Sequence, residues 1–326
     1  TRESITRDVE VVIIGGGFGG MLAAARLQEA GITDFKLIEK GGGFGGTWYW
    51  NRYPGASCDI EAYVYLPLLE ETGFIPQQKY TNAEETLEYC EVLAQRYGLH
   101  EHALLQTQVK KVVWQESSRR WQVTTDRGDV LHARFVIHSN GPLNRPKLPG
   151  IKGIDQFKGH TFHTSRWDYA YTGGNTFGGL SQLSDKRVAV IGTGATAVQC
   201  VPHLAESAKA LYVFQRTPSS IDVRNNQPTD PNWISQQPAG WQKRRQTNFE
   251  SIMSGAPVKE DLVGDGWTEA FRNLFGSIGE LMPSKARLAM WAVQGVFSSK
   301  RRERGLRQYL TDRAIQYMGL IQKMEM

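Results

Sequence analysis

The stretch VEVVIIGGGFGG, residues 9–20, decides the fold. It is an apolar, β-branched run that ends abruptly in a glycine-rich turn. The Ala- and Leu-rich residues 21–30 that follow predict a helix, which Gly31 closes. Residues 35–38 predict a second buried strand. Strand, glycine turn, helix and strand in this order are typical of a βαβ unit that binds a dinucleotide.

Each glycine of such a unit has its own task. The first permits the tight turn, the second lets the backbone approach the pyrophosphate, and the third lets helix and strand pack closely. These tasks fall to Gly15, Gly17 and Gly20. Glu39 follows Gly15 by 24 residues, where a carboxylate accepts hydrogen bonds from ribose hydroxyls. The unit therefore suits an unphosphorylated ADP-ribose, as in FAD or NAD.

A second unit of the same kind begins at residue 187. Its expected elements are a strand over residues 187–191, a glycine turn over 192–197, a helix over 198–206 and a strand over 211–214. The glycine tasks fall to Gly192, Gly194 and Ala197. Arg216 follows Gly192 by 24 residues, and a guanidinium there binds a 2′-phosphate that an acid would repel. This unit suits NADPH, so the chain is predicted to be a flavoprotein reduced by NADPH.

The hexapeptide GGGFGG occurs twice, at residues 15–20 and 41–46. The second copy follows a strand but leads into TWYWNRYPG, residues 47–55, which is no amphipathic helix. Only the first copy has the context of a dinucleotide fingerprint. The sequence therefore does not predict a phosphate loop at the second copy.

Composition excludes several classes of protein. The 326 residues are 22% charged and 40% hydrophobic, as in globular proteins, and suggest two domains of about 150 residues each. The net charge of +5 does not indicate nucleic-acid binding, and the basic residues 300–307 are expected to form a solvated helix face. No apolar run approaches the ~20 residues of a membrane span. Three scattered cysteines predict neither a disulfide framework nor a zinc site and favour the cytoplasm.

Two further segments carry a resemblance. One is GGTWYWNRYPGASCD, residues 45–59, and the other is FxGxxxHxxxWD, residues 157–168. With the two nucleotide units, they make the chain resemble the N-terminal part of a type I Baeyer–Villiger monooxygenase, of the flavin-containing monooxygenase superfamily. The resemblance implies an α/β fold with two Rossmann-like dinucleotide-binding domains, for FAD and NADPH, and a mainly helical segment after the second.

The resemblance also implies an activity and a domain layout. The enzyme would use NADPH and O₂ to convert a ketone to an ester or lactone through a flavin peroxide. The expected domains are an FAD-binding domain over 1–141, a linker over 142–156 and an NADPH-binding domain over 157–326 that includes a helical segment over about 233–326. We expect the strand that completes the FAD domain, and an active-site arginine, to lie beyond Met326. The resemblance leaves the ketone and the oligomeric state open.

The resemblance assigns residues to each cofactor. Besides the glycines and the acid of the first unit, FAD would be lined by Thr47, Trp48, Tyr49, Trp50, Asp59, Tyr65 and Val109. NADPH would be held by Thr193, Gly194, Ala195, Thr196, Ala197, Val198, Gln199, Arg216 and Thr217. For catalysis, Asp59 would orient the downstream arginine, while His163 and Trp167 would couple domain movement to the cofactor rather than do chemistry. No metal site is expected, because His163 has no partner at ligand spacing.

Several alternatives stay open. A related monooxygenase could oxygenate nitrogen or sulfur, and a non-catalytic flavoprotein would bind the same dinucleotides without turnover. A disulfide reductase is disfavoured because the chain has no closely spaced cysteine pair. Residues 171–186 fit either a mobile loop near a substrate entrance or surface decoration. Ser139-Asn140-Gly141 stands where relatives often have Ala-Thr-Gly, a change without an interpretation from the sequence.

Overall fold

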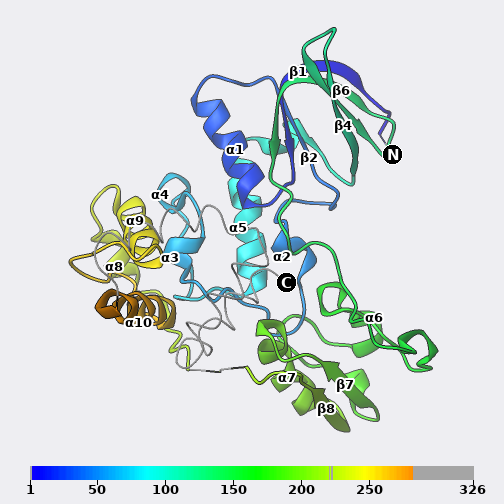
Figure 1. Cartoon of the computed structure of the whole chain (residues 1–326), viewed down its shortest axis with the longest axis vertical. Coiled ribbons are helices and arrows are strands. Elements are labelled where there is room, and N and C mark those ends of the chain that lie inside the picture. Colours follow the sequence, from blue (N-terminus) through cyan, green and yellow to red (C-terminus); the bar gives the residue numbers. More distant parts are fainter. Residues whose placement is uncertain (1, 220, 222, 282–326) are drawn as a thin grey trace.

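The computed structural model describes residues 2–219, 221 and 223–281 of the chain. Figure 1 shows the larger sheet at the top, helices α8 to α10 at the left and the strands β7 and β8 at the bottom, with the helix α5 in the middle. Two separate sheets, each with a glycine turn after its first strand, correspond to the two expected nucleotide units.

The larger sheet carries the first unit. Its strands are β1 (Thr6–Ile14), β2 (Phe35–Ile38), β3 (Ala103–Leu104), β4 (Val109–Gln115), β5 (Arg120–Thr125) and β6 (Val130–His138). They lie in the order β3-β2-β1-β6-β5-β4, with β3, β2, β1 and β6 parallel and β5 and β4 antiparallel. Ile14 of β1 pairs with Ile38 on one side and with His138 on the other. The three strands therefore end at one level, which is where an open α/β sheet binds its ligand.

Burial explains why β1 lies at the centre. Val11, Val12 and Ile13 are all buried, as expected for a parallel strand that is covered on both faces. The helix α1 (Phe18–Glu29) packs Met21 and Ala24 against this strand, and α5 (Ala83–Arg96) closes the same hydrophobic core. The expected order of strand, glycine turn, helix and strand is confirmed.

The second unit consists of β7 (Arg187–Ile191), α7 (Ala195–Ser207) and β8 (Ala210–Phe214), with β7 and β8 paired in parallel. Both strands lie within one residue of the expected bounds. The helix begins three residues earlier than expected, since Gly194 in extended conformation is its N-cap and Ala195 already begins the helix. Ile191 and Phe214 are each 58% exposed, so the described residues leave these strand ends uncovered.

The remaining elements are helical. They are α2 (Thr47–Trp50), α3 (Ala62–Tyr65), α4 (Leu69–Thr72), α6 (Tyr169–Thr172), α8 (Pro231–Ser235), α9 (Trp241–Met253), α10 (Gly266–Leu281) and the 3-10 turns η1 (Leu99–His102), η2 (Ile154–Gln156), η3 (Thr164–Arg166) and η4 (Ser181–Leu183). The last three α-helices fall in the segment expected to be helical. The rest of that segment, 282–326, and its basic stretch lie outside the described residues. No helix in the described ranges has the length and apolar character to cross a membrane.

Residues 171–186 contribute two leucines to the hydrophobic core, while about half of the segment is exposed. Leu180 and Leu183 are fully or almost fully buried, and they pack in one cluster with Trp48 from the first unit and Leu204 from α7. The segment is therefore part of the packing between the two nucleotide units.

Asp129 fastens the N-terminal residues to the turn between β5 and β6. Its fully buried carboxylate accepts hydrogen bonds from Arg2 at 2.5 and 2.6 Å, from the Thr125 hydroxyl at 2.6 Å and from the Ile5 amide at 3.0 Å. The Arg2 guanidinium contributes most to the low pKa of Asp129, which is about 2.

This carboxylate predicts acid sensitivity. A carboxyl whose pKa is depressed by folding stabilises the fold above its unfolded pKa, here by about 2 kcal/mol, and loses that contribution as the pH falls from about 4 to about 2. Asp129→Asn should therefore lower the free energy of unfolding by about 2 kcal/mol at pH 7 and by much less at the acid end of that range. Urea unfolding of both proteins at pH 7 and at the acid end of that range checks this. An equal loss of unfolding free energy at the two pH values would contradict it.

Candidate functional site

A cavity of about 520 Å³ opens at the carboxyl ends of β1, β2 and β6. β1 has a parallel neighbour on each side, β2 and β6, and the carboxyl ends of such central strands are the usual ligand position in an open α/β sheet. Of the residues predicted to hold FAD, the cavity is lined by Gly15, Gly17, Glu39, Thr47, Trp48, Trp50, Tyr65 and Val109. The fold thus brings together residues from five separate segments of the sequence.

The first glycine turn has no room for a side chain at Gly15 or Gly20. Gly15 has a φ of +111°, and a Cβ on Gly20 would lie 1.8 Å from the Gly15 carbonyl oxygen. Gly17 is the N-cap of α1 and brings no capping side chain to the first amides of the helix. Gly20 lies outside the cavity lining and acts through packing, which is the task expected of the third glycine.

Two backbone amides hold the Glu39 carboxylate in place. Its Oε2 accepts from the Gly16 amide and its Oε1 from the Gly41 amide, both at 2.6 Å, and the residue is 6% exposed. Each carboxylate oxygen has a second lone pair. The carboxylate therefore keeps acceptor sites beside the cavity in a fixed orientation, as recognition of ribose hydroxyls requires.

The second GGGFGG copy lies against the first. The Gly45 amide donates to the Gly16 carbonyl at 2.9 Å, and a Cβ on Gly46 would lie 2.8 Å from the Gly17 Cα. Both Gly45 and Gly46 line the cavity. Sequence reasoning set this copy aside because no amphipathic helix follows it, and indeed α2 is one short turn. The repeated glycines at 41–46 could have indicated a second tight loop, because the first glycine turn leaves room only for a neighbour without side chains.

A third loop was also missed. The Ser139 amide donates to the Ile14 carbonyl at 2.8 Å, and a Cβ on Gly15 would lie 2.3 Å from the Ser139 carbonyl oxygen. Ser139, Asn140 and Gly141 line the cavity directly after β6. Their position at the end of a strand parallel to β1 was the available signal.

The aromatic residues after the second glycine copy divide between two places. The Trp48 indole donates to the Tyr65 hydroxyl at 2.9 Å, and both rings line the cavity. Trp50 also lines it, with the Arg166 guanidinium 4.1 Å from its ring centroid. Tyr49 faces Gly41 and lies outside the cavity lining. Three of the four aromatic residues predicted to line FAD are thus at the cavity.

Asp59 and Glu61 are two acids with opposite surroundings. Asp59 is half-buried, and among the described residues its carboxylate has no hydrogen-bond or ion-pair partner. Glu61 is fully buried, and both of its oxygens bind the Arg245 guanidinium, one at 2.9 Å. Burial raises the pKa of Glu61 against the opposing effect of Arg245. Asp59 lies outside the cavity lining and remains available for a cation from another segment.

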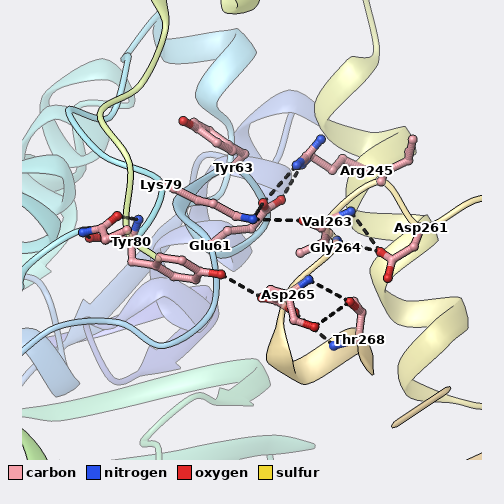
Figure 2. A network of polar contacts seen from close by, with 12 residues as sticks. Glu61, Tyr63, Lys79, Tyr80, Arg245, Asp261, Val263, Gly264, Asp265 and Thr268 are labelled. Carbon is pink, nitrogen blue, oxygen red and sulfur yellow. Dashed lines mark hydrogen bonds and ion pairs between the residues drawn. The ribbon is translucent and has the colours of Figure 1, made fainter. Parts of the chain in front are cut away.

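Figure 2 shows how the Glu61 pair is tied to the C-terminal part of the described chain. The Lys79 ammonium lies 3.9 Å from Glu61 and donates to the Val263 carbonyl at 3.0 Å. Nearby, the Tyr80 hydroxyl donates to Asp265 at 3.3 Å. The loop before α10 and the helix α9 are therefore bound to the segment that follows Asp59.

The second nucleotide turn faces open space. Gly192 has a φ of +110°, and a Cβ on Gly192 or Gly194 would meet no atom within 4 Å. The Thr193 hydroxyl donates to the Thr217 carbonyl at 3.1 Å, which joins the turn to the loop after β8. Arg216 lies exposed in that loop.

The remaining residues predicted to hold NADPH belong to the first turns of α7, and they are Ala195, Thr196, Ala197, Val198 and Gln199. Ala197 is buried, as close packing of helix and strand requires, while Ala195 is exposed. Gln199 differs from the others because both ends of its carboxamide bind the first nucleotide unit, through Tyr53 and Ser57.

His163 and Trp167 make local contacts. The His163 Nδ1 accepts from the Ser165 amide at 3.1 Å and caps η3, and burial lowers the pKa of the ring. The Trp167 indole donates to the Thr172 hydroxyl at 3.0 Å. Neither residue lines the cavity. Next to them, the Tyr169 hydroxyl donates to the Arg52 carbonyl at 2.6 Å, so this segment is bound to the aromatic-rich residues 47–55.

The cysteines have no redox partner. Cys58, Cys90 and Cys200 are free and buried, and burial raises the pKa of the first two thiols to about 12 and of Cys200 to about 11. Such thiols are poor nucleophiles at neutral pH. Within the described ranges, no group of three or more His, Cys, Asp or Glu side chains could hold a metal ion.

The chain is similar to known proteins in both sequence and structure. A family model described as pyridine nucleotide-disulphide oxidoreductase matches residues 12–243. The Baeyer-Villiger monooxygenase ATR8 of Stachybotrys chlorohalonatus is 56% identical over 272 residues, which are 83% of this chain and 44% of that protein. The polycyclic ketone monooxygenase structure from Thermothelomyces thermophila has a TM-score of 0.78 at 44% identity, covering 83% of this chain and 46% of that one.

A structure of OTEMO in complex with FAD and NADP has a TM-score of 0.65 at 37% identity, covering 76% of this chain and 45% of that one. The chain thus spans about half the length of the curated relatives it matches. These similarities agree with the resemblance that the two sequence motifs indicate.

Proposed function

This chain belongs to the pyridine nucleotide-disulphide oxidoreductase family, and we propose that it is the N-terminal part of a Baeyer–Villiger monooxygenase. The full-length protein uses NADPH and O₂ to convert ketones to esters or lactones. The relatives named Baeyer-Villiger or ketone monooxygenase support this proposal. The observation that carries it is the pair of nucleotide turns on one chain, of which one is followed by a fixed acid and the other by an exposed arginine.

The cavity at the carboxyl ends of β1, β2 and β6 fits FAD. Its glycine turn provides a cradle that a Cβ would fill, since such an atom on Gly16 would lie 3.0 Å from the Glu39 side chain. Glu39 would bind the adenosine ribose, and Gly17 would approach the pyrophosphate. Trp48 and Tyr65 supply apolar surface that excludes water from the reacting ring. FAD, once reduced by NADPH, supplies the chemistry that activates O₂. A structure with bound FAD and NADP among the similar proteins supports both cofactors.

Asp59 has an electrostatic role in this proposal. Its half-buried carboxylate has no partner among the described residues and is free to orient a cation that stabilises developing negative charge. His163 and Trp167 couple domain movement to the cofactor in this proposal rather than do chemistry. The hydrogen bond from Tyr169 to the Arg52 carbonyl, which joins their segment to residues 47–55, supports this role.

We assign the domains as the sequence predicts them. Residues 1–141 form the FAD-binding domain, 142–156 the linker and 157–326 the NADPH-binding domain. The exposure of Leu148 and Ile151, at 63% and 47%, supports a linker there. The unpaired cysteines support the cytoplasm as the location.

The reaction is tested with the full-length protein, NADPH, isotopically labelled O₂ and a panel of ketones, amines and thioethers. An ester or lactone that carries one labelled oxygen atom supports the proposal. Labelled N- or S-oxides without any ester would assign the protein to the related N- or S-oxygenating enzymes. Bound flavin that NADPH does not reduce would instead indicate a non-catalytic flavoprotein.

Arg216 should determine the preference for NADPH over NADH. Its guanidinium has no hydrogen-bond or ion-pair partner in the described part of the chain, so it can bind a 2′-phosphate. Losing one or two charge-assisted hydrogen bonds raises the KM for NADPH by about 10- to 100-fold in Arg216→Gln. Steady-state kinetics should show little change with NADH. The matched control is Arg187→Gln, an exposed arginine on β7 of the same unit, and an equal effect there would contradict the assignment.

A further inference from the structure

The loop that leads to Asp59 is bound to the nucleotide helix α7 by one side chain. The Tyr53 hydroxyl donates to Gln199 Oε1 at 2.7 Å, and Gln199 Nε2 donates to the Ser57 carbonyl at 3.0 Å. Both ends of the carboxamide are therefore used by the first nucleotide unit. To turn toward a nucleotide at the start of α7, the side chain would have to break both bonds.

The backbone at this contact approaches as closely as glycine allows. Gly55 has a φ of +77°, and a Cβ there would lie 2.5 Å from the Gln199 carbonyl oxygen and 2.8 Å from His203 Nε2. The Gly55 amide also donates to the Thr176 carbonyl at 2.8 Å. The loop and the helix therefore have little freedom to move independently of each other.

The Tyr53 side chain is held in this contact by burial. It is 8% exposed, and it packs in one hydrophobic cluster with Cys200 and Leu204 of α7. Burial raises its pKa. The neutral hydroxyl therefore donates to a residue of the helix that the sequence assigns to NADPH.

Asp59 follows directly from the bound stretch. After Ser57, the Cys58 amide donates to the Thr81 carbonyl at 2.9 Å, and the Cys58 carbonyl accepts from Arg224 at 3.3 Å. The backbone before Asp59 is thus fixed by several segments of the chain. Through Gln199, the second nucleotide unit also holds this backbone.

We propose that Gln199 is a positioning residue that, through Tyr53 and Ser57, couples nucleotide binding at α7 to the placement of Asp59. It does this without binding the nucleotide itself. The inference rests on the proposed function and refines it, since Gln199 was expected among the residues that hold NADPH. Coupling between two sites is reciprocal, so a change on the flavin side of this contact alters NADP⁺ binding by the same factor, which we expect to be less than about fivefold.

The test uses the FAD-loaded full-length protein and measures hydrogen exchange of the amides of residues 56–60 with and without NADP⁺. Gln199→Leu removes both hydrogen bonds, and Tyr53→Phe removes only the hydroxyl. Glu206→Gln, an exposed residue of the same helix, is the matched control. Affinity for NADP⁺ is measured by calorimetry on each variant, and thermal unfolding confirms that each is folded.

We expect NADP⁺ to slow exchange at residues 56–60 in the unchanged protein and in Glu206→Gln. In Gln199→Leu and Tyr53→Phe this protection should be lost at saturating NADP⁺, while the Kd changes by less than about fivefold. Because Gln199→Leu already removes the hydrogen bond that Tyr53→Phe removes, the double variant should behave like Gln199→Leu.

Three results would overturn the inference. Protection that persists in Gln199→Leu would show that the contact transmits nothing, and so would an unchanged protein without protection despite bound NADP⁺. A Kd raised by more than about fivefold would make Gln199 a direct nucleotide ligand. A full-length protein that does not bind NADP⁺ at all would instead refute the proposed function, together with this inference.

Discussion

Gly20→Ala should abolish retention of FAD. The new Cβ would lie 1.8 Å from the Gly15 carbonyl oxygen, and this atom is backbone, so no side chain can move aside. The helix α1 would have to shift away from β1 and carry the glycine turn with it. Overpacking of this kind costs about 3 kcal/mol or more. The measurement is the visible flavin absorbance per protein molecule after gel filtration, which should fall below about a tenth of the unchanged value if that cost is carried by FAD binding.

The adjacent glycine is the control. A Cβ on Gly19 would lie 3.6 Å from the Ser139 Cβ, which is an ordinary contact, and Gly19 already lies in α1. Gly19→Ala should therefore retain FAD and gain up to about 1 kcal/mol of stability from helix propensity. Equal flavin content in Gly20→Ala and Gly19→Ala would contradict the role given to the turn.

Asp59→Asn should lower the rate of ester formation by about 100-fold or more, since it removes a charge that acts on the reaction electrostatically. The carboxylate has no partner among the described residues, so its loss should leave the free energy of unfolding within about 0.5 kcal/mol of the unchanged value. Activity per bound flavin and thermal unfolding of the same samples check both parts.

Arg245→Met, which removes the partner of Glu61 two residues from Asp59, should give the opposite pattern. It leaves the fully buried Glu61 carboxylate without its guanidinium partner, at a cost of about 3 kcal/mol or more. Thermal unfolding should therefore shift strongly, while activity per bound flavin in the folded protein should fall far less than in Asp59→Asn. If Asp59→Asn instead destabilised the protein and kept its activity, Asp59 would be a structural acid.

The βαβ units could be predicted from the sequence because their signals are local. The turn at Gly15 and its acid Glu39 follow each other at fixed spacing, and so do Gly192 and Arg216. The bounds of β2 and β7 match the sequence prediction. Close packing of α1 required the glycine at position 20, as the prediction of its task implied.

Other parts of the site depend on contacts between distant segments. Gly46 touches Gly17 only because the sheet returns β2 beside β1, and Ser139 reaches Gly15 only because β6 pairs with the other side of β1. No local pattern shows this. In the same way, the contact of Gln199 with Tyr53 joins residues 146 positions apart. The role of the loop before β7 was not predictable for the same reason.

The most direct test of the account is the anaerobic reduction of the FAD-loaded full-length protein by NADPH or by NADH. The loss of flavin absorbance is the measured signal. The account predicts complete reduction by NADPH, with a rate at equal low concentration at least about tenfold above that with NADH. Flavin that stays oxidised with NADPH, or that NADH reduces equally fast, would contradict the claim that two nucleotide units with opposite charges serve one flavin.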